Sequence, residues 1–147
     1  MKKKRKISIA IATINKHHND TIKESKALIN YKIFIINNKE DLKKINKSIS
    51  FIFFLHWRWR VDNFFLKKNN CICFHMTDLP FGRGGSPLQN LILNGFKETY
   101  LSAFKMSEKL DSGPVYLKRK IKLSGSADEI YNIVMIKNSS SCSYSSS

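Results

Sequence analysis

The run ISFIFFLH at residues 49–56 decides the fold. Apolar or aromatic side chains fill most of its positions, which is typical of a β-strand buried on both faces of a sheet. Three further runs have the composition of strands, at residues 7–14, 31–37 and 71–76. Amphipathic segments at 20–30 and 40–47 separate the first three strands and favour helices. This alternation predicts right-handed crossovers and an α/β fold with a mainly parallel sheet.

The second half of the chain changes character. Glycines and prolines between residues 80 and 87 indicate a loop. A helix is expected over 87–95, with Pro87 at its start and Gly95 past its end. Strands are expected at 99–106 and 115–123, followed by a helix that begins at a Ser126–Glu129 capping box. We expect one domain over residues 1–137 and a disordered, serine-rich tail over 138–147.

The chain is strongly basic, with a formal net charge of +15. A charge of this size is typical of proteins that bind a polyanion such as nucleic acid. However, 21 lysines, 18 isoleucines and 13 asparagines make up about a third of the chain, and the lysines are scattered. We therefore interpret the charge mainly as a bias of composition. A basic nucleic-acid-binding module stays open as a rival, although the arginines and aromatic residues form no recognised motif.

The cysteines and the N-terminus bear on the compartment. Cys71, Cys73 and Cys142 are an odd number without a disulfide framework or the spacing of a zinc site, so no metal and a reducing, cytoplasmic compartment are expected. MKKKRKISIAIATI at 1–14 is open to two interpretations, a signal peptide or a first strand. The alternation of isoleucine favours the strand. No apolar run reaches the roughly 20 residues that cross a bilayer, so no membrane partner is expected.

The segment FHMTDLPFGRGGSPLQN at 74–90 carries most of the chemistry. His75 ends the fourth strand, and ligands of open α/β sheets bind outside the carboxyl ends of strands. The glycines that follow let a ligand approach the backbone, and Arg83 can bind an anion. Asp111 lies 36 residues after His75, in the turn-like LDSGP. From the residues alone, a structural histidine is the commoner interpretation of His75, and a turn former that of Asp111.

Residues 71–134 resemble the folate-dependent formyltransferase family. The resemblance lies in HMTDLPFGRGGSPLQNLILNG (75–95), which matches a histidine, a turn ending in Leu-Pro, an Arg-Gly segment and a Pro-led helix. KETYLSAFKMSEKLDSGPVYLKRKI (97–121) follows, with the Glu-Thr strand and the Asp-x-Gly turn in the same order. The resemblance implies a Rossmann-like fold and transfer of a formyl group from 10-formyltetrahydrofolate to a primary amine.

The resemblance also implies the roles of individual residues. His75 and Asp111 take two positions of the catalytic trio, and Cys73 takes the position of the family asparagine. Because a thiol is a weaker hydrogen-bond donor than an amide, this difference predicts impaired activity. The residues implied in binding the folate donor are Leu55, His56, Trp57, Arg58, Thr77, Asp78, Leu79, Pro80, Lys109 and Leu110. Those implied in binding the acceptor are Arg83, Gly84 and Gly85.

The acceptor is predicted to be a primary amine of a small metabolite or an amino-sugar nucleotide. Methionyl-tRNA formyltransferases usually carry a second, C-terminal domain, and the sequence after residue 137 predicts none, so tRNA is the less favoured acceptor. Two alternatives stay open: activity like that of a methionyl-tRNA formyltransferase, and a truncated or inactive homologue. The sequence gives no indication of the oligomeric state.

Overall fold

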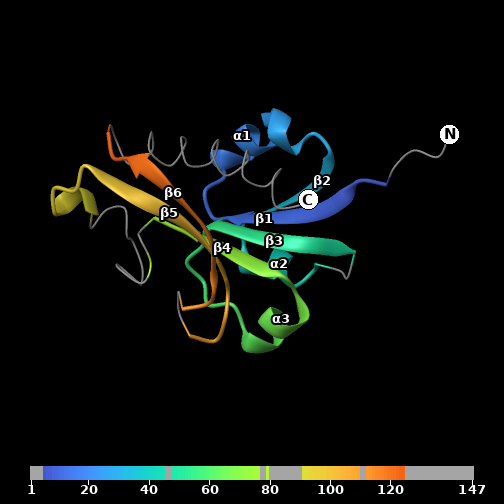
Figure 1. Cartoon of the computed structure of the whole chain (residues 1–147). Coiled ribbons are helices and arrows are strands. Elements are labelled where there is room, and N and C mark those ends of the chain that lie inside the picture. The colour runs from blue at the N-terminus through green and yellow to red at the C-terminus, as the bar shows by residue number, and fades with distance from the viewer. Residues whose placement is uncertain (1–4, 46–47, 77–78, 80–90, 110–111, 125–147) are drawn as a thin grey trace.

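The computed structural model describes residues 5–45, 48–76, 79, 91–109 and 112–124 (Figure 1). Within these residues, six strands form a sheet in the order β2-β1-β3-β4-β5-β6. The strands are β1 (Ile7–Thr13), β2 (Tyr31–Ile36), β3 (Ile49–His56), β4 (Cys71–His75), β5 (Glu98–Lys105) and β6 (Val115–Lys122). β1 to β4 pair in parallel, and β5 and β6 are added antiparallel. The predicted Rossmann-like, mainly parallel α/β fold is confirmed.

Short helices connect the parallel strands. They are α1 (His18–Glu24), the 3-10 turn η1 (Lys26–Leu28), α2 (Lys39–Leu42) and α3 (Asn63–Lys68). The first three overlap the segments at 20–30 and 40–47 that were predicted to be helical. α2 ends at Leu42, before the end of its predicted segment, and α3 was not predicted. Residues 91–93 are helical, and Gly95, with a φ of 76°, follows them as predicted.

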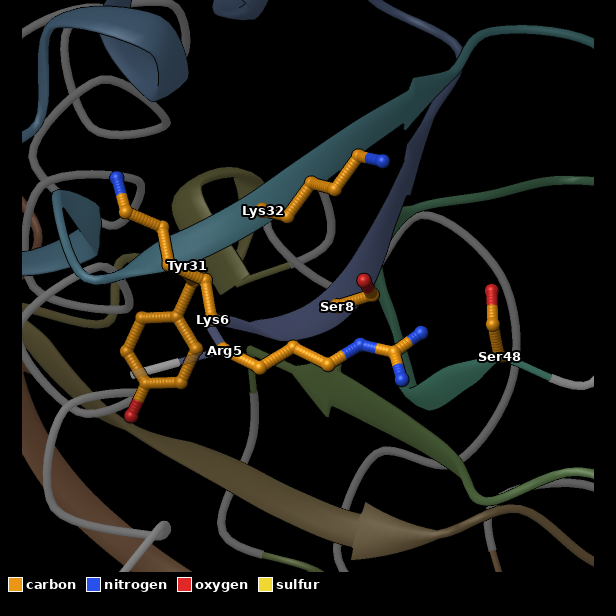
Figure 2. A pocket seen from close by; sticks show the side chains of 6 residues that line it. All are labelled: Arg5, Lys6, Ser8, Tyr31, Lys32 and Ser48. Carbon is orange, nitrogen blue, oxygen red and sulfur yellow. The ribbon is translucent and has the colours of Figure 1, made fainter. Parts of the chain in front are cut away.

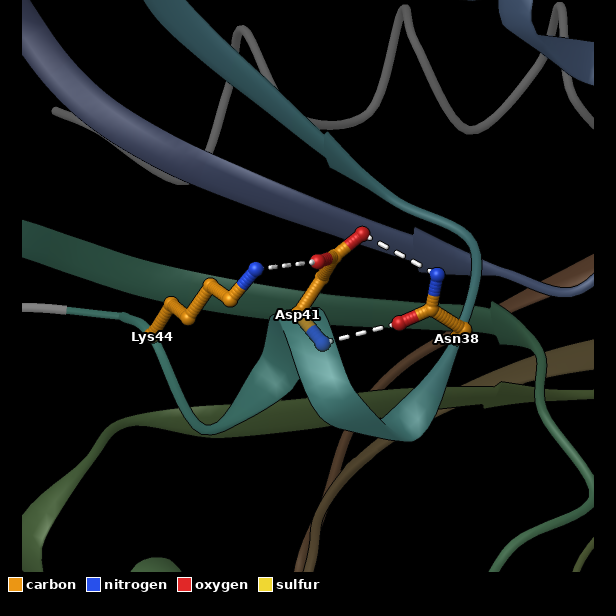
Figure 3. A network of polar contacts seen from close by, with 3 residues as sticks. All are labelled: Asn38, Asp41 and Lys44. Atoms are coloured by element: carbon orange, nitrogen blue, oxygen red, sulfur yellow. Dashed lines mark hydrogen bonds and ion pairs between the residues drawn. The ribbon is translucent and has the colours of Figure 1, made fainter.

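Side chains cap α2 and α3 where these helices begin. At α2, Asn38 Oδ1 accepts a hydrogen bond from the backbone N–H of Asp41 at 2.8 Å (Figure 3). Asn38 Nδ2 donates to Asp41 Oδ2 at 3.1 Å, and Asp41 Oδ1 lies 3.3 Å from Lys44 Nζ. At α3, Asp62 accepts from the backbone N–H of Phe64 at 2.8 Å. Such caps satisfy backbone donors that a helix start leaves without partners, so helices this short can form.

The two faces of the sheet carry two separate apolar cores. On one face, Ile22 of α1 and Leu28 of η1 pack with strand residues that include Phe53 and Phe74. On the other, Leu42 of α2 and Leu66 of α3 pack with a second set of strand residues. Figure 1 shows α1 and α3 on opposite sides of the sheet. Because successive strand residues face opposite ways, β1 and β3 contribute to both cores, as the apolar run of β3 predicted.

The parallel strands define two edges of the sheet. We call the edge at the carboxyl ends of β1–β4 the carboxyl edge and the opposite one the amino edge. β5 starts at the carboxyl edge and runs back, so the connection from β5 to β6 leaves from the amino edge. None of the described helices is long and apolar enough to cross a membrane. The helix predicted after Ser126 and the serine-rich tail lie outside the described residues.

Candidate active site

His75 is the last residue of β4 and lies at the carboxyl edge. Its side chain is buried, with 7% of its surface exposed. On one side its backbone is in register with Ser102 of β5, which is also buried. On the other side, Cys73 is in register with Phe54 of β3. The last residues of β3 therefore lie beside His75, and the two strands end together.

The two thiols of β4 lie on one face of the sheet, because residues two apart in a strand point the same way. Cys71 is buried in the core formed with α2 and α3, and Cys73 packs partly against the same core. Burial raises the pKa of the Cys71 thiol to about 12, so this residue is a poor nucleophile. Cys73 is half-buried and its Sγ lies 3.7 Å from the carbonyl oxygen of Phe74. Alternation along the strand puts His75 on the same face as both thiols.

The start of the turn after His75 is tied to the antiparallel strands. Thr99 Oγ1 donates to the carbonyl oxygen of Met76 at 2.9 Å. The backbone N–H of Leu79 donates to Ser102 Oγ at 3.5 Å, and Lys118 Nζ donates to the carbonyl oxygen of Leu79 at 2.7 Å. Leu79 is itself buried. β5 and β6 thus fix the backbone on both sides of residues 77 and 78.

The connection from β5 to β6 closes tightly around Gly113. The backbone N–H of Lys105 donates to the carbonyl oxygen of Pro114 at 2.9 Å. A Cβ added to Gly113 would lie only 1.6 Å from the carbonyl oxygen of Lys105. No larger residue fits there without moving the backbone. The glycine of the LDSGP motif is therefore required by packing, two residues after Asp111.

The described part of this connection approaches the face on which the β4 thiols lie. The backbone N–H of Met106 donates to the carbonyl oxygen of Cys71 at 2.9 Å, and the Met106 side chain packs against the core formed with α2 and α3. Asn63, the first residue of α3, donates a hydrogen bond to Glu108. The chain that leads to Asp111 thus runs along the α3 side of the sheet, which is the side of Cys73.

Aromatic residues gather where β3 ends. The Trp57 ring lies 5.6 Å from the Phe54 ring and 4.9 Å from the Trp59 ring, in edge-to-face arrangements. The guanidinium of Arg58 lies 4.9 Å from the Trp59 ring centre. Trp57 Nε1 is buried and has no hydrogen-bond partner among the described residues. Because a buried donor of this kind normally has a partner, this indole is suited to bind a ligand acceptor.

A polar cluster that the sequence analysis missed lies at the carboxyl ends of β1 and β2. Thr13 and His18 are both almost completely buried, and Thr13 Oγ1 lies 3.3 Å from His18 Nδ1. Asn15 Nδ2 lies 3.4 Å from His18 Nε2. Asn37 Nδ2 donates to the carbonyl oxygen of Thr13 at 2.7 Å. The signal in the sequence is a polar residue at the end of one apolar strand, Thr13, and directly after another, Asn37.

His56, the last residue of β3, joins this cluster to the aromatic group. Its carbonyl oxygen accepts from the backbone N–H of Ile14 at 2.8 Å, and its ring centre lies 6.5 Å from that of His18. Burial lowers the pKa of the His56 imidazole, because the charged form loses its hydration. This edge therefore combines two adjacent imidazoles with buried hydroxyl and amide groups.

Only part of the predicted site lies among the described residues. The structure brings together His75, Cys73, Leu55, His56, Trp57, Arg58 and Leu79 at or next to the carboxyl edge. Lys109 is described and exposed. Outside the described residues lie Asp111, Thr77, Asp78, Pro80, Leu110, Arg83, Gly84 and Gly85. No group of three potential metal ligands was found among the residues that were described.

The strand order and the histidine at the end of β4 define a Rossmann-like α/β protein with a polar carboxyl edge. Known proteins are similar to it in sequence and in fold. The methionyl-tRNA formyltransferase of Mycoplasma genitalium is 39% identical over 85 residues, which are 55% of this chain and 26% of that protein. The structure of methionyl-tRNA formyltransferase from Clostridium thermocellum is 39% identical, with a TM-score of 0.77 over 88% of this chain and 59% of that chain.

A more distant structure shares the fold. It is the formyltransferase PseJ from Anoxybacillus kamchatkensis, with a TM-score of 0.62 and 13% identity over 92% of this chain and 71% of that chain. No family model matches the chain. The chain spans only 18% to 26% of the length of the curated relatives it matches. By sequence, this chain is similar to methionyl-tRNA formyltransferases, and its fold is the one that solved formyltransferase structures share.

Proposed function

We propose that this chain transfers a formyl group from 10-formyltetrahydrofolate to a primary amine, and that its first candidate acceptor is methionyl-tRNA. The observation that carries the proposal is the position of His75. The imidazole ends β4 at the carboxyl edge, directly beside the aromatic end of β3, in a chain similar to methionyl-tRNA formyltransferases.

The reaction needs an oxyanion stabiliser and a path for one proton. The amine nitrogen bonds to the formyl carbon, the bond from that carbon to the donor nitrogen breaks, and one proton passes from the amine to the donor nitrogen. His75 would donate a hydrogen bond to the oxygen on which negative charge develops. Asp111 would orient that imidazole and accept the proton on its way from the amine.

Cys73 would hold the third position with a weak donor. In the proposed site its thiol replaces an amide that would bind the same oxygen, and thiols are weak donors. Removing one donor from such a site typically lowers the rate by about a hundredfold to a thousandfold. We therefore expect transfer to be slow, unless a backbone N–H at this edge supplies the missing hydrogen bond.

The aromatic end of β3 fits the folate donor. A pterin is flat and rich in hydrogen-bonding groups, so the Trp57 and Trp59 rings suit it as walls and the buried Trp57 Nε1 as a donor. The residues proposed to hold the folate are Leu55, His56, Trp57, Arg58, Thr77, Asp78, Leu79, Pro80, Lys109 and Leu110. When bound, the folate supplies the activated formyl group. We place the activity in the cytoplasm, since Cys71 and Cys73 are free thiols.

The acceptor is proposed to bind at Arg83, Gly84 and Gly85. The names of the relatives support methionyl-tRNA better than the small amine favoured by the sequence analysis. One observation keeps an amino-sugar nucleotide as the second candidate. The PseJ structure shares the fold and was solved with tetrahydrofolate and a formamido sugar nucleotide.

Binding of the donor can be tested directly, because the chain has only two tryptophans and both lie at the proposed folate site. Titration of the full chain with tetrahydrofolate should quench the intrinsic tryptophan fluorescence with a saturable curve. A Trp57→Phe variant should lose most of the quenching and bind less tightly, since it lacks the Nε1 donor. If tetrahydrofolate does not bind, the proposed function is wrong.

The acceptor is then identified by turnover. The full chain is mixed with 10-formyltetrahydrofolate and either methionyl-tRNA or a UDP-linked amino sugar, and release of tetrahydrofolate is measured. Uncharged tRNA and an N-acetylated sugar nucleotide, which lack the free amine, are the matched controls. Folate binding without transfer to either amine would support the inactive homologue instead.

A further inference from the structure

A basic hollow lies at the amino edge, far from His75 (Figure 2). It has a volume of about 480 Å³ and is lined by Arg5, Lys6, Ser8, Tyr31, Lys32 and Ser48. Arg5 and Lys6 precede β1, Tyr31 and Lys32 begin β2, and Ser48 precedes β3. The hollow thus collects the starts of three neighbouring strands.

The hollow has the chemistry of an anion site. Three of its six residues are cationic, three carry hydroxyl groups and none is acidic. Among the described residues, no carboxylate forms an ion pair with the three cations. Arginine offers a planar pair of N–H donors that matches a phosphate, and hydroxyl groups add further donors.

The three cations of the hollow differ in the groups that they contact. Figure 2 shows the Arg5 side chain extending between Ser8 and Ser48, while Lys6 points away from them. Lys6 Nζ donates to the carbonyl oxygen of Ile29 at 3.0 Å, which holds the start of β1 against the start of β2. Lys32 Nζ lies 5.3 Å from the Phe34 ring centre and is exposed. Arg5 and Lys32 are therefore the cations that can bind an external anion.

The distance to His75 restricts the class of ligand. At about 3.3 Å per residue, the seven residues of β1 separate the two edges by roughly 20 Å. A small amine bound at the carboxyl edge cannot reach the hollow. A nucleic acid that presents its end at one edge can place backbone phosphates at the other.

We propose that the basic hollow binds phosphates of an RNA backbone. The proposal rests on the proposed function only for the identity of that RNA, which would be the acceptor tRNA. Arg5 and Lys32 each neutralise one phosphate, and the hydroxyl groups of Ser8 and Ser48 face the same space. A concave, hydroxyl-lined hollow suits a phosphate chain better than a flat lipid surface.

The test is a salt series of RNA binding. Binding of uncharged tRNA to the full chain is measured by fluorescence anisotropy, for the native sequence and for Arg5→Ala/Lys32→Ala. Neutralising a phosphate contributes a slope of about −0.9 in a plot of log affinity against log salt. The double variant should therefore lower the magnitude of the slope by about 2 and weaken binding by roughly tenfold per lost contact at about 0.1 M salt.

The matched control removes the same charge elsewhere. Lys23 of α1 and Lys67 of α3 are exposed and lie outside the hollow, so Lys23→Ala/Lys67→Ala should leave the slope nearly unchanged. Equal losses in both variants would overturn the proposal in favour of a diffuse charge effect. If millimolar inorganic phosphate fully inhibits RNA binding, the hollow is a site for a free anion instead. If the chain binds anionic phosphatidylserine vesicles but not RNA, the hollow is a membrane-binding surface instead.

The readout separates this proposal from the proposed function. RNA binding is measured without folate and without formyl transfer. Loss of transfer with the salt effect intact would reject only the formyltransferase proposal, whereas transfer with no salt effect would reject only the hollow. Arg5 and Lys32 are exposed, so both variants should keep the native far-UV circular dichroism spectrum.

Discussion

The carboxyl and amino edges of the same sheet differ in the burial of their polar side chains. All the side chains that are both polar and buried among the described residues lie at or near the carboxyl edge: Thr13, His18, His75, Thr99 and Ser102. At the amino edge, the polar residues of the basic hollow are exposed or half-buried. Buried polar groups are costly without partners, so they are held in fixed geometry, whereas exposed charges act over a distance. The carboxyl edge is therefore suited to position reacting groups, and the amino edge is suited to attract anions.

The strongest test of the carboxyl edge is His75→Ala. If the imidazole stabilises the oxyanion, turnover should fall by about a hundredfold to a thousandfold, or roughly 3–4 kcal/mol of transition-state stabilisation. Quenching of tryptophan fluorescence by tetrahydrofolate should persist. The exposed His17 gives the control, and His17→Ala should retain full turnover. Equal turnover in the two variants would remove His75 from the site.

Gly113→Ala tests whether the close packing of the β5–β6 connection at the amino edge stabilises the fold. The new Cβ would meet the carbonyl oxygen of Lys105, so we expect a loss of about 3 kcal/mol in the free energy of unfolding. Gly95 is the matched glycine, because it has a positive φ but nothing within 4 Å of an added Cβ. Gly95→Ala should cost only about 1 kcal/mol. Urea denaturation measures both, and a larger loss at Gly95 would contradict the packing argument.

Cys73→Asn tests whether residue 73 at the carboxyl edge contacts the oxyanion. If residue 73 faces the oxyanion, an amide donor should raise turnover by roughly tenfold or more, since donors at this position typically contribute more than that. Cys73→Ala removes the thiol without adding a donor and should produce no increase. An unchanged rate in Cys73→Asn, with the fold intact, would mean that residue 73 does not contact the reacting group.

The smallest expected effect is a pH dependence of the free energy of unfolding, due to His56. Burial lowers the pKa of this imidazole in the folded chain, while the unfolded chain takes up the proton near the ordinary value of 6.5. Below that pH the unfolded state binds more protons, so the free energy of unfolding should decrease as the pH falls. His56→Gln should lose part of this decrease between about pH 7.5 and about pH 5.5, measured by urea denaturation. His17→Gln should keep all of it.

The fold was largely predictable because its strands are marked by composition. The run at 49–56 forms β3 with both ends as predicted. The other strands differ by one residue at one end or, for β5, at both ends. α3 was missed for a physical reason. Its apolar residues Phe64, Phe65 and Leu66 are consecutive, and only Leu66 is buried, so no helical periodicity is visible. The Asp62 cap was the available signal.

The candidate site was predictable only where chemistry is local in the sequence. His75 was found because a histidine ends an apolar strand, and the structure places it at the expected edge. The cluster of Thr13, His18 and Asn37 was missed, because its members meet through strand pairing between distant segments. The role of Asp111 remains a prediction, since that residue lies outside the described part of the chain.

The order of the strands also matters during synthesis. β1 is made first, yet it lies between β2 and β3 and must wait for both before its backbone groups are paired. β4 pairs with β3, which is made before it, and with β5, which is made after it. β5 in turn pairs with β6, the last of the six strands to be made. A ribosome-bound chain that has exposed residues 1–75 would thus contain His75 without Ser102 or Lys118 to fix its turn. We expect the part of the carboxyl edge at the end of β4 to become ordered only after the β5–β6 hairpin emerges, so it should resist proteolysis later than the ends of β1, β2 and β3.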